Sequence, residues 1–539
     1  MNIMEKVSLK EKIGYALGDG AANIAWRGVS TFLIIFYTDV FGLNPAAVGL
    51  LMLIARFGDG VSDVVMGMIG DRTNTKYGKF RPWILWTAIP LGGILSLLFT
   101  TPDLSPVGKI IYAYSTYIIF TLVYTANNIP YGALMAVMTG DDKVRTSIGS
   151  FRMVGAFAGG MIVQGALLYL VAYYGDIQPN VTLTELDQNK YELMISVDTD
   201  VENVNVSTKH GIATFVWNDQ TVPDSVNVPT KSKSFSMQGG TPYSFVVTSE
   251  NDLAPDNFTI IDQKKGYSNA IYLLSIVLSL ALFITFVSTK ERIKVPKTQK
   301  SNLKQDFVDL VKNRPWLVLL IVGLVFQVYN SIKQGIVVIY FAHYIHNQLL
   351  AASYMVALMV ASIAGAMATS FLARRFGKRN LFIYAFLFSG AVNALLVFCG
   401  PGDITSIFAI GIVSEFGAAI FPTLFFAMLG DAADYSEYKN GRRATGLIYS
   451  AGSFSTKFGG GVAGAIIGMV LAAYQYNGQD SVAIEGAIPG IVLLMSWLPA
   501  VIAFVGAVLM IFYPLNQSKM DEITTELNKR RVNELASEI

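Results

Sequence analysis

The sequence contains few cysteines, histidines and charged residues, and each shortage excludes a class of protein. One of the 539 residues is a cysteine, Cys399, and three are histidines. Disulfide frameworks and cysteine-rich or histidine-rich metal sites are therefore excluded. Charged residues make up 14% of the chain, and 40 basic residues balance 38 acidic ones, so no net field recruits nucleic acid.

Catalytic signatures are missing as well. The sequence has no GxxxxGKS or GxxxxGKT phosphate loop, no nucleophile elbow and no histidine cluster for a catalytic metal. We therefore expect a protein that is not an enzyme, needs no cofactor and does not hydrolyse ATP. The charged N-terminus MNIMEKVSLKEK also lacks the features of a cleavable signal peptide.

The chain consists instead mostly of apolar sequence, with 53% hydrophobic residues and a mean hydropathy of +0.47. About twelve runs approach the length of about 20 residues that a helix needs to cross a bilayer. The predicted spans are residues 13–38, 45–70, 82–100, 109–138, 149–174, 267–288, 316–344, 350–373, 380–399, 404–429, 445–474 and 487–513. We therefore predict an all-α membrane protein with twelve transmembrane helices, surrounded by lipid.

Short loops rich in Lys and Arg remain in the cytoplasm, so their positions orient the chain. Basic residues collect at both termini and in the loops after the second, sixth and eighth spans, whereas the alternate loops have almost none. We therefore predict cytoplasmic termini and a multi-pass protein of a plasma membrane.

The loops also indicate an internal repeat. The basic segment DRTNTKYGKFR after the second span has a shorter counterpart, ARRFGKRN, after the eighth. These positions correspond if residues 1–175 and 266–288 form one six-helix half, 289–315 a cytoplasmic linker, 316–514 the second half and 515–539 a cytoplasmic tail. Two such halves are the layout of major facilitator carriers.

Residues 176–265 interrupt the first half and differ from it in composition. Their segments YELMISVDTDV, GIATFVWND and TPYSFVVTSEN mix β-branched and aromatic residues with polar ones, as strands do. We predict a small β-rich extracytoplasmic insertion between the fifth and sixth helices. It could be a cap, a module that docks an outer partner, or a device that captures substrate.

Three charged residues in the second span point to a cation site. Arg56, Asp59 and Asp63 are spaced by three and four residues and share one helical face. Because charges inside a membrane are costly, each needs a partner or a function. Two carboxylates one turn apart can bind Na⁺ or hold a proton. An ion pair between Arg56 and Asp59 that only joins helices is the alternative, but it leaves Asp63 unexplained.

The first span carries a polar stripe of Asp19, Asn23 and Arg27, with Trp26 beside it. Such a stripe must face the bundle interior or an aqueous cavity. Carboxylate, amide, guanidinium and indole groups suit a polyhydroxylated ligand, although an interhelical hydrogen-bond network would use the same groups.

The fourth span has three polar residues, Thr125, Asn127 and Asn128, just before Pro130. A proline inside a helix frees a backbone carbonyl, and small polar groups can use the gap. We interpret this segment as part of a binding surface, although amides in membrane helices often only bridge helices.

The C-terminal half contains three charged residues within its spans: Lys333, Glu415 and Lys457. Lys457 lies just before three glycines and could neutralise the carboxylates of the second span. The segment from 431 to 446 is dense in charges of both signs, and we interpret it as a cytoplasmic gate or hinge network that includes Asp431, Asp434 and Arg442.

These segments together resemble one known family. GYALGDGAANIAW, ARFGDGVSDVVMGMIGDRTNTKYGKFRPW, YTANNIPYGAL, LGDAADYSEYKNGRRATGLIYS and STKFGGG are similar to glycoside-pentoside-hexuronide:cation symporters of the major facilitator fold, which include the melibiose carrier. The resemblance follows nearly all twelve spans in order. Residues 176–265 lie outside the family's usual pattern.

The resemblance implies roles for individual residues. The family's cation site falls on Asp59, Asp63 and Thr125. Two sugar-binding carboxylates of the melibiose carrier fall on Asn23 and Asn128, and its nearby tryptophan falls on Gly132, which weakens any inference of an α-galactoside. The family's fifth-helix arginine matches Arg152, expected at the sugar or a gate, and its eleventh-helix lysine matches Lys457, expected to couple the halves.

We therefore expect a symporter that moves a glycoside, pentoside or hexuronide with Na⁺ or H⁺ by alternating access. Its sugar site would contain Asp19, Asn23, Trp26, Asn128 and Arg152, with Arg56, Lys333 and Lys457 in coupling. Two alternatives stay open: a carrier for an organic anion or drug, and a sensor that acts through the insertion. The sequence leaves the oligomeric state undetermined, and the resemblance implies a bacterial inner membrane.

Overall fold

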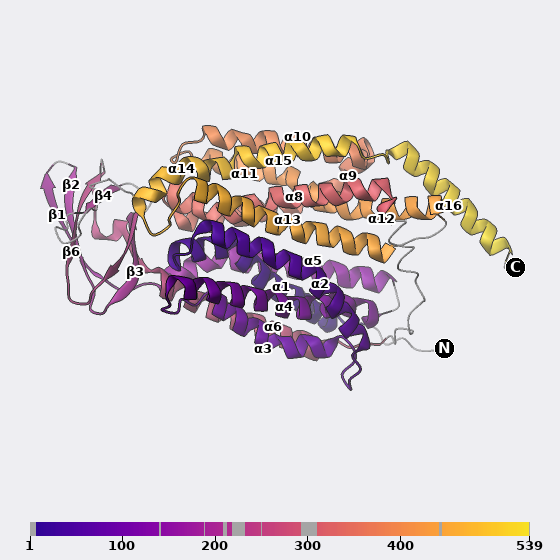
Figure 1. The fold of residues 1–539 in the computed structure, drawn as a ribbon, viewed down its shortest axis with the longest axis horizontal. Helices are drawn as coiled ribbons and strands as arrows, with labels where there is room; N and C mark the ends of the chain where they lie inside the picture. Colours follow the sequence, from indigo (N-terminus) through magenta and orange to yellow (C-terminus); the bar gives the residue numbers. More distant parts are fainter. Residues whose placement is uncertain are drawn as a thin grey trace. The chain divides into compact units, whose positions relative to one another are not determined.

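The computed structural model describes residues 7–139, 142–187, 189–208, 213–217, 232–249, 251–292, 310–440 and 445–537 (Figure 1). It is mainly helical, with one strand-rich segment. Ten helical stretches among these residues are long and apolar enough to cross a membrane. The helices α1 and α2 complete the twelve predicted spans.

The helices of the N-terminal half are α1 (Leu9–Ile35), α2 (Pro45–Arg72), α3 (Arg81–Leu98), α4 (Pro106–Met138), α5 (Asp142–Tyr174) and α6 (Gln263–Ser288). Those of the C-terminal half are α8 (Arg314–Ile339), α9 (Gln348–Phe376), α10 (Lys378–Ala394), α11 (Ile404–Ala418), α12 (Ile420–Asn440), α13 (Thr445–Ala473), α14 (Ser481–Met495) and α15 (Trp497–Ile511). The tenth span consists of α11 and α12, and the twelfth of α14 and α15. The predicted twelve-helix fold class is confirmed.

Local sequence signals explain where several helices begin. Ser8 accepts a hydrogen bond from the backbone of Glu11, whose carboxylate accepts one from the backbone of Ser8. Asn44 and Ser105 cap α2 and α4 in the same way, each directly before a proline. Such caps satisfy backbone N–H groups that have no partner inside the helix, and proline fits the first helical position.

Two boundaries near the predicted cytoplasmic side differ from the sequence analysis. The tenth span does not end at 429, because α12 continues to Asn440 through most of the segment interpreted as a gate. The added turns of α12 are stabilised because Ala432 and Ala433 are buried and the Asp431 carboxylate is bonded to Lys378. The predicted tail contains a further helix, α16 (Gln517–Ser537), which packs Ile523 and Leu527 on the core of the C-terminal half.

The predicted β-rich insertion between the fifth and sixth spans is also confirmed. Its strands are β1 (Asn180–Asp187), β2 (Lys190–Ser196), β3 (Val201–Thr208), β4 (Ala213–Trp217), β5 (Ser232–Met237), β6 (Tyr243–Ser249) and β7 (Phe258–Asp262). They pair in two antiparallel sheets, ordered β1-β2-β6-β4 and β5-β3-β7. Buried residues of both sheets, such as Leu193, Val204 and Phe245, form a hydrophobic core of their own.

The insertion joins the helices through a narrow connection. The backbone N–H of Asp262 donates to the carbonyl of Gly175, so the two ends of the insertion lie side by side (Figure 1). Lys264 forms an ion pair with Glu202 on β3, and this ammonium lowers the pKa of the Glu202 carboxyl. The strands therefore form a separate layer at the ends of α5 and α6.

The chain divides into two compact units. The first unit contains the described residues of 1–295, together with 335–356 and 467–491. The second contains those of 296–334, 357–466 and 492–539. The first unit thus combines the described residues of the N-terminal half and the insertion with the ends of helices from the C-terminal half.

Within the first unit, glycines allow α1 and α5 to approach closely. A Cβ atom on Gly155 would lie 2.0 Å from the carbonyl oxygen of Ala16, and one on Gly159 would lie 2.1 Å from that of Gly20. Small residues at four-residue spacing are the usual means of close helix packing in membranes. This contact sets the distance between Asp19 on α1 and Arg152 on α5.

Alanine at Gly159 should therefore destabilise the protein, because its methyl group has no room beside the backbone of α1. Overpacking of this kind costs about 1–3 kcal/mol. Alanine at Gly149 on the same helix is the matched control, since no atom lies within 4 Å of its Cβ position. Gly149→Ala should be neutral or stabilising by up to about 1 kcal/mol. Thermal unfolding in detergent measures both, and equal effects would contradict the packing argument.

Candidate functional site

The proposed cation residues lie on α2 and α4 of the first unit. Asp63 Oδ1 accepts a hydrogen bond of 3.1 Å from the Thr125 hydroxyl, so the structure brings together two of the three residues that the resemblance implies. Asp59 is held differently, because its Oδ2 lies 2.6 Å from the Arg56 guanidinium in a pair whose side chains are 5% and 6% exposed. The structure thus contains the ion pair that the sequence analysis considered as the alternative reading for Asp59.

Arg56 has two further partners that could not be predicted from the amino-acid sequence. Its guanidinium donates to the hydroxyl of Tyr117 at 2.8 Å, and its Cζ lies 4.5 Å from the centre of the Trp26 ring. A guanidinium stacks favourably on an indole face. Trp26, which we predicted as a sugar-binding residue, therefore connects α1 to the charged residues of α2.

The proposed sugar residues on α1 and α5 form an ion pair. Arg152 Nε lies 3.2 Å from Asp19 Oδ1, and the arginine side chain remains 31% exposed. The Asn23 amide donates to the backbone carbonyl of Asp19 at 2.9 Å, so part of its hydrogen-bonding capacity is used within α1. The structure therefore brings Asp19, Asn23 and Arg152 together.

Aromatic side chains line this pair. Tyr15 and Tyr131 stack with ring centres 4.5 Å apart, and each hydroxyl donates to the other residue's backbone carbonyl. Arg152 lies over the Tyr131 ring. These tyrosines occur in GYALGD and IPYGAL, but spacing alone does not show that two distant tyrosines meet.

The asparagines of α4 have separate roles. Asn128 donates to the Tyr124 hydroxyl at 2.8 Å, and Tyr124 in turn packs against Trp26. Asn128 therefore remains near the aromatic residues of the proposed sugar site. Asn127 instead donates to Thr87 on α3, which makes it a bridge between helices.

The predicted coupling residues of the C-terminal half fall in the second unit. Lys333 pairs with Glu415 at 3.3 Å, and Lys378 pairs with Asp431 at 2.6 Å. Lys457 and Asp434 lie half-buried on α13 and α12. Arg442 lies outside the described residues.

A cluster at the insertion end of the first unit was missed by the sequence analysis. Asp39 accepts hydrogen bonds from Thr38 and Tyr476 on Oδ1 and is bonded to His343 Nε2 on Oδ2, at 2.6, 2.7 and 2.7 Å. We call Asp39, Thr38, Tyr476 and His343 the outer cluster. It joins the end of the first span to the end of the seventh span and to the segment that follows α13.

The outer cluster also reflects the internal repeat. The first and seventh spans both end in a five-residue π-helix, Phe36–Val40 and Tyr340–Tyr344. Asp39 and His343 are the fourth residues of these two segments. π-helical turns often occur at functional positions. In the sequence, this correspondence could be found by comparing FYTDV with YFAHY. It becomes visible only when the first and seventh spans are aligned with each other.

Comparisons with known proteins agree with this architecture. A model of the MFS/sugar transport protein family matches residues 14–197 and 236–517. The inner membrane symporter YicJ of Escherichia coli is 30% identical over 540 residues, covering 98% of this chain and 97% of that protein. The isoprimeverose transporter of Lactiplantibacillus pentosus is 27% identical, covering 98% and 93%. The putative glycoside/cation symporter YagG of Escherichia coli is 29% identical, covering 98% and 96%.

Solved structures support the same fold. A bacterial homologue of the human lysosomal transporter Spinster has a TM-score of 0.61 at 11% identity, covering 94% of this chain and 98% of that chain. A D-xylose-proton symporter has a TM-score of 0.57 with the same identity and coverage. The protein is therefore a multi-pass membrane carrier of the major facilitator fold, not an enzyme. More specifically, it belongs to the MFS/sugar transport family, among the glycoside-pentoside-hexuronide:cation symporters.

Replacement of Asp39 by Asn should loosen the outer cluster, because the bonds from Tyr476 and His343 lose a charged acceptor. Hydrogen bonds to charged groups contribute about 1.5–3 kcal/mol each, so access from outside should rise about tenfold or more. A cysteine at Ser30, nine residues earlier on α1, reports this access through its labelling rate with a membrane-impermeant maleimide. The single native cysteine is first replaced by Cys399→Ser.

Asp480→Asn is the matched control, since Asp480 is exposed and only caps the start of α14. It should leave the labelling rate unchanged. A labelling rate in Asp39→Asn equal to that of the parent would show that the outer cluster does not hold this end closed.

Proposed function

We propose that this protein is a secondary active symporter that imports a glycoside, pentoside or hexuronide together with Na⁺ or H⁺. The observation that carries the proposal is the proximity of two kinds of polar group in the first unit. Asp59 and Asp63 with Thr125 supply oxygen ligands for a cation, and the pair Asp19–Arg152 lies among aromatic rings suited to a sugar. Relatives named as glycoside/cation symporter and isoprimeverose transporter support the same class of substrate.

The sugar would bind between α1, α4 and α5. The Asp19 carboxylate accepts hydrogen bonds from sugar hydroxyls, while Arg152, Asn23 and Asn128 donate them. Tyr124 and Trp26 offer flat apolar faces. Because Asp19 and Arg152 already neutralise each other, a neutral polyol can insert without leaving a charge uncompensated.

Arg56 is suited to connect the two sites. It neutralises Asp59, and it also contacts Tyr117 and the ring of Trp26. A cation at Asp59 and Asp63 would compete with the guanidinium, which then retains Tyr117 and Trp26 as partners. Movement of Trp26 would carry the change to the sugar site, so each ligand alters the affinity for the other.

The alternative function, transport of an organic anion, has less support. Arg152 and Lys333, which an anionic solute would need, are both paired with carboxylates. A bacterial inner membrane with cytoplasmic termini suits the named relative YicJ and the basic loops. For residues 176–265, the proposal includes an outer partner that docks on the insertion.

Asp63→Asn should abolish accumulation while leaving sugar exchange intact, because the coupling cation loses a charged ligand but the sugar residues remain. Uptake of labelled glycosides, pentosides and hexuronides into proteoliposomes under imposed Na⁺ or H⁺ gradients measures this. Sugar should also tighten cation binding by about 5- to 150-fold in the wild type, the usual range of such coupling. Asp103→Asn, in an exposed loop, is the control and should transport normally. A wild-type protein that is folded but accumulates no sugar under either gradient would refute the proposal.

Removal of the insertion should preserve transport. Because Gly175 and Asp262 are directly hydrogen-bonded, residues 178–260 can be replaced by a short Gly-Ser linker without separating α5 from α6. The same proteoliposome assay should show gradient-driven uptake. Asn203→Ala, which removes only a side-chain contact between β3 and the carbonyl of Val40, is the control with the insertion in place. Loss of uptake from a folded linker variant would instead assign the insertion a part in transport.

A further inference from the structure

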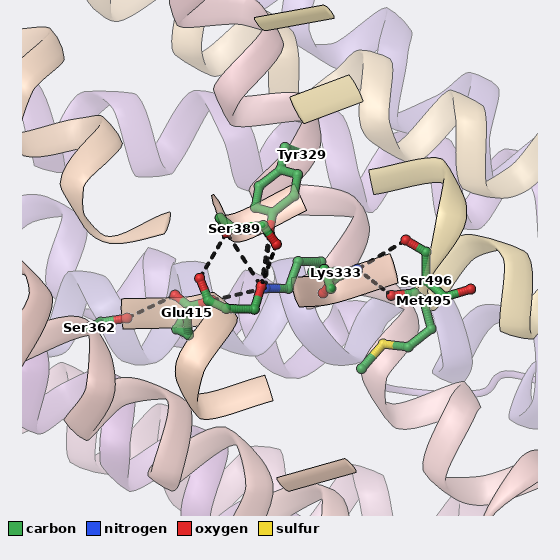
Figure 2. Close-up of polar contacts among 9 residues, drawn as sticks. Tyr329, Lys333, Ser362, Ser389, Glu415, Met495 and Ser496 are labelled. Atoms are coloured by element: carbon green, nitrogen blue, oxygen red, sulfur yellow. Dashed lines mark hydrogen bonds and ion pairs between the residues drawn. The ribbon is translucent and has the colours of Figure 1, made fainter. Parts of the chain in front are cut away.

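The ion pair between Lys333 and Glu415 in the second unit belongs to neither the proposed cation site nor the proposed sugar site (Figure 2). Lys333 Nζ on α8 lies 3.3 Å from Glu415 Oε2 on α11, 3.2 Å from Ser414 Oγ and 3.4 Å from the Tyr329 hydroxyl. Glu415 Oε1 accepts a hydrogen bond of 2.8 Å from Ser362 on α9. Three helices thus meet at one ion pair.

This pair lies near the middle of the membrane. Lys333 precedes the end of its span, Tyr344, by eleven residues, and Glu415 follows the start of its span, Ile404, by the same number. At 1.5 Å per residue, each is about 16 Å from the span end, roughly half the thickness of a hydrocarbon core. Ionisable groups at that depth are expensive and usually mark a pathway for substrate or ions.

The pair is more open than the comparable pair in the first unit. Arg56 and Asp59 are 2.6 Å apart and almost fully covered. Lys333 and Glu415 are 3.3 Å apart, and the glutamate side chain is 22% exposed while the lysine is 5% exposed. A pair that served only to join helices would have no need of an accessible carboxylate.

The exposed side of Glu415 faces the bundle interior and not lipid. On α9, the exposed apolar residues Val360, Met367 and Phe371 mark the lipid face, with exposures of 55%, 77% and 62%. Ser362 follows Val360 by two residues, which is about 200° around the helix. Because Ser362 bonds to Glu415, the carboxylate lies on the side of α9 that is turned away from lipid.

The surrounding surface of α8 is polar as well. Half-buried side chains recur along one face of this helix: Gln327, Asn330, Ser331 and Gln334. Gln327 donates to Ser331 at 2.9 Å, and the glycines of α13 lie close to both. Amide and hydroxyl groups along a membrane helix indicate a protein or water-lined interior, so α8 presents polar groups on either side of Lys333.

We propose that Glu415 and Lys333 form a hydroxyl-binding subsite for the transported solute in the C-terminal half. The subsite rests on the proposed sugar symport and adds to it a solute contact within the second unit. One sugar hydroxyl can donate to Glu415 and accept from Lys333, which bridges the ion pair. Because the pair is neutral as a whole and its open group is a carboxylate, the subsite selects uncharged hydroxyls and repels the carboxylate of a hexuronide.

The test compares Glu415→Gln with wild type in proteoliposomes, using the sugar that the wild type accumulates best. Loss of a charge-assisted hydrogen bond should raise the sugar concentration for half-maximal uptake about tenfold to a hundredfold. Glu522→Gln, an exposed residue of α16 in a surface pair, is the matched control and should not change it. The affinity for the coupling cation, measured in the absence of sugar, should be the same in both variants as in the wild type.

Singly deoxygenated forms of the same sugar provide a readout that a structural role would not alter. The hydroxyl that contacts Glu415 is the one whose removal weakens wild-type binding but not binding by Glu415→Gln. If Glu415→Gln does not fold, the double variant Lys333→Gln with Glu415→Gln replaces it, because it leaves no uncompensated charge.

Three outcomes would overturn the subsite. They are unchanged affinity with a lowered melting temperature, equal losses for every deoxy sugar in both proteins, and a change in cation dependence alone. A wild type that transports no sugar is a different failure, because it refutes the proposed function before the variant is compared.

Discussion

The cost of an ionised group inside a bilayer is the constraint on which this structure depends. Among the described residues, charge pairs offset this cost, including Asp19 with Arg152, Arg56 with Asp59, and Lys333 with Glu415. Each pair joins residues of two helices or adjacent turns and includes further polar or aromatic partners. Once the charges are paired, the helices that carry them are fixed in their rotation, and small residues such as Gly155 and Gly159 then allow close packing.

The same pairing makes the carrier adjustable. A charge pair in a medium of low dielectric is strong when complete and costly when one partner is removed, so a ligand that replaces one partner must supply equivalent contacts. Sugar hydroxyls can do so for Asp19 and Arg152, and a cation can do so for Asp59. The outer cluster around Asp39 is built in a similar way, because a histidine at the end of the seventh span and a tyrosine after α13 both bond to one carboxylate.

Hydropathy and loop charge were sufficient to predict the twelve spans and the insertion, because both follow from local composition. The extension of α12 to Asn440 was not predictable in this way, since the helix continues where its charged residues find partners such as Lys378 on another helix. For the site, spacing placed Asp59 and Asp63 on one face, and the resemblance added Thr125 and Arg152. The contacts of Arg56 with Tyr117 and Trp26, and of Asp39 with His343, join residues far apart in the sequence, which no periodicity reveals.

The two π-helical ends offer a physical reason for an outer closure built from unlike residues. An internal repeat places the first and seventh spans in equivalent positions, so the fourth residues of both π segments approach one another when the ends meet. Two identical carboxylates there would repel each other, whereas the Asp39 carboxylate and the His343 imidazole form a hydrogen bond of 2.7 Å. Unlike residues at these equivalent positions therefore allow a hydrogen-bonded contact where two carboxylates would not form one.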